Sequence, residues 1–294
     1  MLFEGIIPAV TTPFDSSGAV DQAALERNVR ALLEAGVHGL VATGTMGEAA
    51  SLTPAERRAV VEAVAAAAAG SVPVVAGVSS STPEQVNARA ADAVAAGAQA
   101  IMLLPPLGYR ASERELVEWY AAAARAGTPV MAYNNPEASG TDMPADVIAR
   151  LADVDGVVAV KECSGDARRI PAILETVEGR LEVLVGGDDW ALEGFSAGAT
   201  GWVSGVAVVA PRECIALYEH VRAGELESAR AAYRRLLPLA RFDMTPKLVQ
   251  YFKAAMDAVG LAGGPCRPPR LELEPEERAA LDHALRVLGA EVAV

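Results

Sequence analysis

Strand-like and helix-like segments alternate along most of the chain, and this alternation restricts the fold more than any other feature. Amphipathic stretches typical of helices occur at Asp21–Ala35, Pro54–Ala69, Pro83–Ala96, Ser112–Ala126, Pro144–Ala152, Asp166–Val177 and Asp189–Ala197. Between them, apolar runs typical of buried parallel strands begin near Ile6, Leu40, Val72, Ala100, Val130, Val157, Leu181 and Gly201. Eight strands alternating with helices predict an α/β fold, a (β/α)₈ or TIM barrel.

Local signals at the ends of these segments support the assignment. Thr53-Pro54 and Thr82-Pro83 each place a capping hydroxyl before a proline at the first helical position. Glycines stand where helices should end, at Gly36, Gly70, Gly97, Gly127 and Gly198. An open doubly wound sheet is the alternative, but no Gly-x-Gly-x-x-Gly turn follows the first strand.

Strand patterns cease after Pro211. Helical patterns then cover Arg212–Ala223, Glu225–Ala240 and Pro246–Val259, and a last helix starts near Pro275. We therefore expect a barrel over residues 1–210 and a C-terminal helical extension over residues 211–294. We expect the extension to be attached to the barrel rather than to form an independent domain.

Composition limits the partners. The chain has 294 residues, 52% hydrophobic and only 5% aromatic, so its core must consist mostly of Ala, Val and Leu. The formal net charge of −13 argues against nucleic acid or an anionic membrane as a partner, because both require basic patches. No apolar run is long enough to span a bilayer, and Met1–Gly5 shows no signal-peptide pattern.

Cysteines and histidines are few and scattered. Cys163, Cys214 and Cys266 are odd in number and widely spaced, which is typical of free thiols in a reducing cytoplasm. The histidines lack the spacing of metal ligands; they are His38, His220 and His283. We therefore expect a cytoplasmic protein without a metal or other cofactor.

Two buried strand segments end on side chains that could react together. The run Gly156–Glu162 carries Lys161 near its end, and Pro129–Pro136 carries Tyr133. If the two strands are parallel neighbours, the amine and the phenol meet at the same end of the sheet. This pair suits Schiff-base chemistry with the phenol as proton shuttle. Alternatively, Lys161 only marks the strand end and points to solvent.

A third strand end is rich in glycine. In Ala42–Glu48, glycines at 44 and 47 would let backbone N–H groups approach an anion such as a carboxylate. The hydroxyl of Thr45 could relay a proton to or from Tyr133. The alternative is an ordinary strand-to-helix turn. An imine on Lys161 would permit C–C cleavage, β-elimination or hydrolytic ring opening, and the pattern does not choose among them.

Together these motifs resemble a known family. Gly44-Thr45-x-Gly47-Glu48, Tyr133-Asn134-x-Pro136 followed by Gly140, Val160-Lys161-Glu162 and the opening Gly5–Phe14 are similar to the dihydrodipicolinate synthase / N-acetylneuraminate lyase family of class I aldolases. The resemblance covers the whole chain. It implies Lys161 as the Schiff-base lysine, Tyr133 as the proton shuttle, Thr45 as the relay and the Gly44–Met46 backbone as the carboxylate site. It also implies a homodimer or homotetramer.

Three positions depart from the family's synthase. Met46 replaces a second Thr or Ser, and Ala138 replaces an arginine that binds the carboxylate of the aldehyde substrate. Leu107 stands where the synthase has a tyrosine that reaches a neighbouring subunit, and Tyr109 is displaced from that position. We therefore do not expect the lysine-biosynthetic synthase activity.

Other motifs are similar to one branch, the 1-pyrroline-4-hydroxy-2-carboxylate deaminases of hydroxyproline catabolism. They are Tyr133–Pro136, Gly187–Glu193, Gly201–Gly205 and Leu248–Gln250. This branch implies release of ammonia and 2-oxoglutarate semialdehyde from a small cyclic imine acid. The expected substrate-binding residues are Gly44, Met46, Gly47, Leu107, Asn135, Ala138, Gly187 and Ser204.

Two other functions stay open. One is an aldolase that splits a 2-keto-3-deoxy sugar acid or a 4-hydroxy-2-oxo acid into pyruvate and an aldehyde. The other is a non-catalytic barrel that binds a 2-oxo acid as a sensor, which has no need of a reactive amine. Asp188 and Asp189 could either cap the helix that follows them or contact the substrate.

Overall fold

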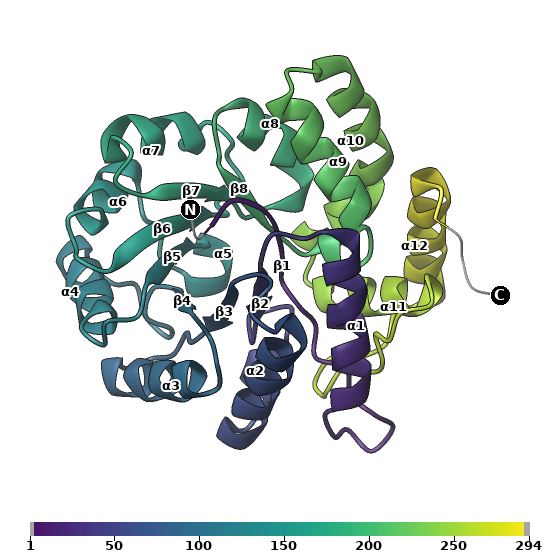
Figure 1. The fold of residues 1–294 in the computed structure, drawn as a ribbon, viewed down its shortest axis with the longest axis horizontal. Helices are drawn as coiled ribbons and strands as arrows, with labels where there is room; N and C mark the ends of the chain where they lie inside the picture. The colour runs from purple at the N-terminus through teal and green to yellow at the C-terminus, as the bar shows by residue number, and fades with distance from the viewer. Residues whose placement is uncertain (1–2, 291–294) are drawn as a thin grey trace.

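A computed structural model describes residues 3–290, so the interpretation of Met1–Gly5 and the end of the 211–294 extension lie partly outside the described residues. Eight parallel strands form one sheet in the order β1-β8-β7-β6-β5-β4-β3-β2 (Figure 1). They are β1 (Gly5–Pro8), β2 (Leu40–Ala42), β3 (Val74–Gly77), β4 (Ala100–Leu103), β5 (Val130–Asn134), β6 (Val157–Glu162), β7 (Glu182–Val185) and β8 (Gly201–Ser204). The predicted barrel is confirmed.

The barrel closes through a short seam between β1 and β2. A bridge pairs Ala9, directly after β1, with Val41 in the middle of β2. In addition, the backbone N–H of Val10 donates to the carbonyl of Val41 at 2.8 Å. Both strands lead directly into loops at the carboxyl ends of the strands, where a barrel carries its reactive groups.

Helices surround the barrel on the outside (Figure 1). They are α1 (Gln22–Ala35), α2 (Pro54–Ala68), α3 (Pro83–Ala95), α4 (Glu113–Ala124), α6 (Ala145–Leu151), α7 (Arg169–Val177) and α8 (Ala191–Ser196). The short helix α5 (Pro136–Ser139) directly follows β5 and lies within this ring of helices (Figure 1). Short 3₁₀ turns add η1 (Ala49–Ser51), η2 (Asp188–Trp190), η3 (Val206–Val208) and η4 (Arg241–Met244). The sequence did not predict α5.

Most of the predicted helix ends agree with the structure. Thr53 accepts the N–H of Glu56 at 3.3 Å, and Thr82 accepts the N–H of Gln85 at 3.4 Å, so both caps are confirmed. The predicted helix from Asp166 starts only at Arg169. The carboxylate of Asp166 instead accepts the N–H of Arg168 at 3.0 Å, a local bond that competes with a helical turn.

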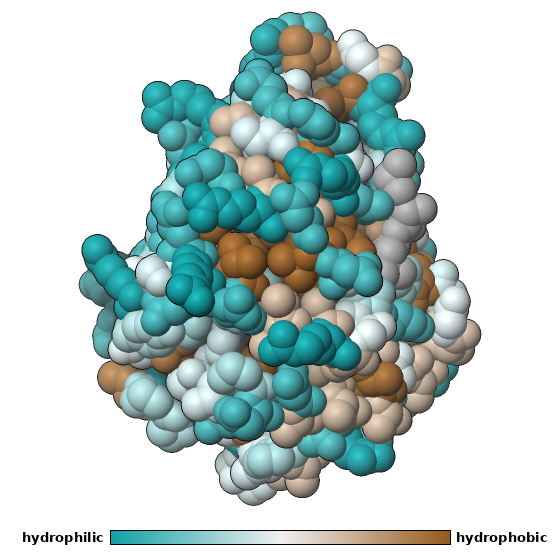
Figure 2. Space-filling view, turned by 90° about the vertical axis from the view of Figure 1, so that its left-hand side faces the viewer, coloured by the Kyte–Doolittle hydropathy of each residue, from teal (hydrophilic) through white to brown (hydrophobic). Residues whose placement is uncertain are grey.

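Apolar side chains fill the space inside the barrel and between the sheet and the helices. β3, for example, consists of Val74, Val75, Ala76 and Gly77, and all four are buried. Figure 2 shows the face formed by the helices on the left of Figure 1. Hydrophilic side chains cover most of it, as expected for helices that turn their apolar stripe inward, and some apolar side chains are visible across its middle.

The C-terminal helices pack beside the barrel, on the right of Figure 1. They are α9 (Pro211–Arg222), α10 (Leu226–Ala240), α11 (Leu248–Ala258) and α12 (Pro275–Leu288). α9 packs on β1, and α10 packs on α9 and α12. No helix within residues 3–290 has both the length and the apolar character needed to cross a membrane.

One buried lysine joins this layer to the barrel seam. Lys253 on α11 is 1% exposed. Its amine donates to the Glu48 carboxylate at 2.9 Å, to the Thr12 carbonyl at 3.0 Å and to the Pro265 carbonyl at 2.6 Å. Thr12 follows β1 and Glu48 follows β2, so the C-terminal layer is fastened to both sides of the seam.

Candidate active site

Lys161 and Tyr133 lie side by side at the carboxyl ends of neighbouring strands. The β5–β6 register pairs the two residues directly, which confirms that the amine and the phenol share one strand end. Each is only 6% exposed. The Lys161 amine lies 4.1 Å from the centroid of the Tyr133 ring. Among the described residues, the amine has no hydrogen-bond or ion-pair partner within bonding distance.

The phenol of Tyr133 is held in place by Asn135. The Asn135 amide donates to the Tyr133 hydroxyl at 2.9 Å, while its oxygen accepts the Ala138 N–H at 3.0 Å and so caps α5. Burial raises the pKa of Tyr133 well above its ordinary value, and the neighbouring Cys163 raises it further. The phenol is therefore protonated at neutral pH and can donate a proton.

The loop after β2 supplies backbone N–H groups. Thr43 has a positive φ of 53° and bonds through its hydroxyl to the Gly77 carbonyl at 3.1 Å. A Cβ at position 77 would lie 2.4 Å from the Thr43 carbonyl, so only glycine permits this close approach. The N–H groups of Thr45 and Met46 donate to no other described residue. Two free N–H groups in a glycine-containing turn suit a carboxylate.

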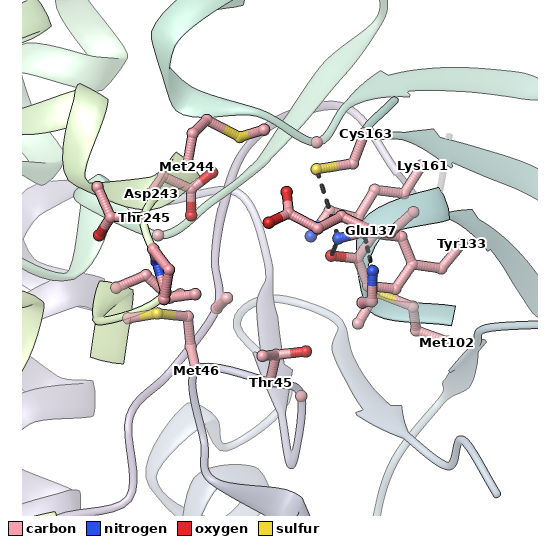
Figure 3. A pocket seen from close by; sticks show the side chains of 18 residues that line it. Thr45, Met46, Met102, Tyr133, Glu137, Lys161, Cys163, Asp243, Met244 and Thr245 are labelled. Carbon is pink, nitrogen blue, oxygen red and sulfur yellow. Dashed lines mark hydrogen bonds between the residues drawn. The ribbon is translucent and has the colours of Figure 1, made fainter. Parts of the chain in front are cut away.

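These groups border one cavity of about 210 Å³ (Figure 3). Seven of the residues expected from the sequence line it: Gly44, Thr45, Met46, Tyr133, Asn135, Ala138 and Lys161. Thr45 is exposed, and its hydroxyl makes no hydrogen bond to Tyr133 in this arrangement. The relay from Thr45 to Tyr133 therefore stays a prediction.

Four other expected residues lie outside the cavity lining. Gly47 packs against the first strand, where its carbonyl accepts the Thr12 hydroxyl at 2.8 Å. Leu107 borders the adjacent cavity on the other side of Thr45. A Cβ at Gly187 would lie 2.3 Å from the Trp190 indole nitrogen, so this glycine makes room for packing. Ser204 is buried, and its hydroxyl accepts the Ala207 N–H at 3.0 Å.

Comparison with known protein families gives independent information. The model described as the dihydrodipicolinate synthetase family matches residues 2–288. The chain belongs to this family. A curated relative, the 4-hydroxy-tetrahydrodipicolinate synthase of Methanothrix thermoacetophila, is 36% identical over 97% of this chain and 96% of its own length. An uncharacterized DapA-like lyase of Halobacterium salinarum is 34% identical over 97% of this chain and 94% of its own.

Solved structures of the family agree with the fold. A putative dihydrodipicolinate synthetase from Pseudomonas aeruginosa superposes with a TM-score of 0.92 at 38% identity, covering 97% of this chain and 99% of its own. The dihydrodipicolinate synthase of Aquifex aeolicus gives a TM-score of 0.94 at 27% identity, covering 99% and 100%. These names bear out the family, but they do not single out the hydroxypyrroline deaminase branch.

Several cavity residues of this family member were not expected from its sequence. One wall comes from the segment after α10, with Asp243, Met244, Thr245, Pro246 and Leu248. The others are Ala9, Met102, Glu137, Cys163, Gly186 and Gly205. Glu137 and Gly186 directly adjoin predicted residues, so strand-end position could have found them. The 243–248 wall follows a helix rather than a strand.

Asp188 has a structural role in this family member. Its carboxylate accepts the indole N–H of Trp202 at 2.9 Å and the backbone N–H groups of Gly205 at 3.2 Å and Val206 at 2.6 Å. It therefore ties the end of β7 to the end of β8 and does not line the cavity. Asp189 does not line the cavity either. Within residues 3–290, no three His, Cys, Asp or Glu side chains cluster as metal ligands would.

Proposed function

We propose that this family member is a Schiff-base deaminase that converts 1-pyrroline-4-hydroxy-2-carboxylate into 2-oxoglutarate semialdehyde and ammonia. The observation that carries the Schiff-base chemistry is the Lys161 amine, buried beside Tyr133 and without an ion-pair partner among the described residues. Attack of this amine on C2 of the cyclic imine releases the ring nitrogen as an amine. Loss of the 4-hydroxyl as water and hydrolysis of the resulting imines complete the reaction.

The substrate carboxylate would bind at the N–H groups of Thr45 and Met46. Both residues line the cavity, on the side opposite the wall that carries Lys161 in Figure 3. Tyr133 would supply and remove the protons at nitrogen and at C3. Its raised pKa keeps the proton on the phenol until a stronger base forms in the reaction.

The charge of the cavity supports a substrate with a single carboxylate. No arginine lines it, and position 138 is an alanine. Glu137 and Asp243 both line it, so two carboxylates border the substrate, Glu137 beside Tyr133 and Lys161 and Asp243 across from them (Figure 3). A second substrate carboxylate would be repelled there, whereas a hydroxyl or an ammonium group would find an acceptor.

The aldolase reaction is the second candidate, and the same two carboxylates favour it. Three of the substrate-binding residues expected from the sequence, Met46, Leu107 and Ala138, are apolar, and a lining of this kind would offer nothing to a polyhydroxyl tail. Leu107 lies outside this cavity, however, and Glu137, Asp243 and Thr245 add polar groups. A hydroxylated 2-oxo acid could therefore be bound as well.

Product analysis separates the two reactions. With purified enzyme, ammonia release from 1-pyrroline-4-hydroxy-2-carboxylate and little pyruvate from keto-deoxy sugar acids would support the deaminase. The reverse result would support the aldolase. Condensation of pyruvate with aspartate semialdehyde should be negligible, because Ala138 provides no cation for the second carboxylate. Efficient condensation would contradict the argument from the charge of the cavity.

A further inference from the structure

The carboxylate of Asp243 occupies an unusual position in the cavity. It belongs to η4, which follows α10 in the C-terminal layer, yet it lines the same cavity as Lys161. In Figure 3, Asp243 lies across the cavity from Tyr133 and Lys161, beside Met244 and Thr245. The cavity thus has the Tyr133 phenol and the Lys161 amine on one wall and the Asp243 carboxyl group on the other.

Its hydrogen bonds leave one carboxylate oxygen available. Oδ2 accepts the backbone N–H of Asp188 at 3.3 Å. Oδ1 has no hydrogen-bond partner among the described residues. A Cβ on Gly205 would lie 3.0 Å from this Oδ1, so the glycine gives the carboxylate its place beside the cavity.

The charges around Asp243 do not neutralise it in the way that a structural ion pair would. No Lys, Arg or His of residues 3–290 comes within ion-pair distance of its carboxylate. By contrast, the Asp188 carboxylate beneath it receives three N–H donors. The titratable groups that face Asp243 are Asp188 and Asp189 on η2, Lys161 and Cys163 at the end of β6, and Tyr133 on β5.

We propose that Asp243 is a further catalytic residue, the acid that protonates the group leaving from the substrate carbon remote from Lys161. This inference rests on the proposed deaminase function. In the imine with Lys161, Tyr133, whose own proton has gone to the released ring nitrogen, takes a proton from C3. The electron pair of that C–H bond forms the C3=C4 double bond, and the C4–O bond breaks with its pair on oxygen. Asp243 gives its proton to this oxygen, which departs as water, and later regains a proton from solvent.

The electrostatics of the site agree with this role. Burial raises the pKa of Asp243 to about 6, while the Lys161 amine lowers it. Burial and the charge of Asp243 also raise the pKa of Asp188 well above its usual range. Because the two carboxyls interact, they titrate as a pair. A group with a pKa near neutrality can both hold a proton before the step and release it during the step.

The test compares two leaving groups in the full-length enzyme. Asp243→Asn should lower ammonia release from the 4-hydroxy substrate by at least about 100-fold, a typical general-acid contribution. With 1-pyrroline-4-fluoro-2-carboxylate, whose fluoride leaves without a proton, the same variant should keep elimination within about tenfold of wild type. Borohydride reduction with pyruvate should still label Lys161, which shows that the fold and the amine are intact.

Three further measurements complete the experiment. Asp166→Asn changes an exposed carboxylate that does not line the cavity, and it should match wild type with both substrates. In wild type, kcat/KM for the 4-hydroxy substrate should fall as the pH rises above about 6, and this limb should be absent in Asp243→Asn. Asp243→Glu should restore part of the rate.

The outcomes separate this inference from the proposed function. If wild type releases ammonia from the 4-hydroxy substrate and Asp243→Asn does so at a rate within tenfold of wild type, the role of Asp243 is overturned. The proposed function is then unaffected. Equal losses with both leaving groups would also overturn it, because they indicate a structural role. Absence of wild-type deamination would overturn the function and this inference together.

Discussion

Two lysines of residues 3–290 are buried, one at a strand end and one on α11, and they differ in what surrounds the amine. The Lys253 amine has three oxygen acceptors, including the Glu48 carboxylate. The Lys161 amine has the face of the Tyr133 ring at 4.1 Å and a cavity. Because burying a charge without a partner is costly, a fully satisfied amine indicates a structural role. An unsatisfied amine beside a cavity indicates a group kept for reaction.

The most severe test of this comparison is Lys161→Ala. We expect turnover to fall at least about 10⁴-fold, because no covalent imine can form without the nucleophile. Mass spectrometry after borohydride reduction with pyruvate should show an adduct on the Lys161 peptide of wild type and none in the variant. Lys253→Met provides the matched control and should keep the adduct. An adduct on a different lysine would remove Lys161 from the mechanism.

Tyr133→Phe should have the next largest effect. Turnover should drop roughly 10²–10⁴-fold, the usual contribution of a general acid–base group. The ring that packs on the Lys161 amine is retained, so thermal stability should change little. Steady-state kinetics and a melting curve would measure the two effects. A rate within tenfold of wild type would assign the proton transfer to another residue.

Lys253→Met tests whether the second buried lysine has a structural role. Removing this amine leaves the Glu48 carboxylate buried with only Arg270 at 3.5 Å as a charged partner. We expect a loss of about 3 kcal/mol in the free energy of unfolding, as for other broken buried pairs. Urea denaturation would measure it, with Lys161→Met as the matched control, expected to change stability by less than about 1 kcal/mol. Similar losses in both variants would refute the distinction.

A smaller effect on stability is expected from Glu56. Its ion pair with Arg267 lowers the pKa of Glu56 to about 2. A carboxylate whose pKa is lower in the folded protein stabilises the fold at a pH above its pKa in the unfolded chain. This contribution is lost as the pH falls toward 2. Since the pair is partly exposed, Glu56→Gln should cost about 1 kcal/mol at pH 7. Denaturation at pH 7 and pH 3 should show the difference shrinking at the lower pH, and an equal difference at both would contradict it.

The sequence was sufficient to predict the barrel and the central pair of the site. Continuous apolar runs identified β5 and β6, and parallel pairing of neighbouring strands brought Tyr133 beside Lys161. This inference needs only local patterns and one topological rule. The same rule applied to the loop after β2, so Gly44, Thr45 and Met46 were found as well.

The wall opposite Tyr133 could not be predicted in this way. Asp243 lies in a 3₁₀ turn after α10, and only the packing of the C-terminal layer brings it to the cavity. Lys253 is similar, because a lysine in an amphipathic helix ordinarily faces solvent. Leu107 was placed in the pocket from its loop position, but the path of that loop carries it to the adjacent cavity. Long-range packing, rather than periodicity, decides these cases.

The seam between β1 and β2 has a consequence for how the protein is made on the ribosome. Synthesis runs from the N-terminus, so β1 and β2 leave the ribosome long before Lys253 and the 263–267 segment that hold their loops together. Domains tend to fold as units during synthesis. A nascent chain that ends before residue 253 can assemble the strands that carry Tyr133 and Lys161. It lacks the Lys253 hydrogen bonds that connect the loops after β1 and β2. The loop after β2 therefore gains its final form only when the last part of the chain has emerged.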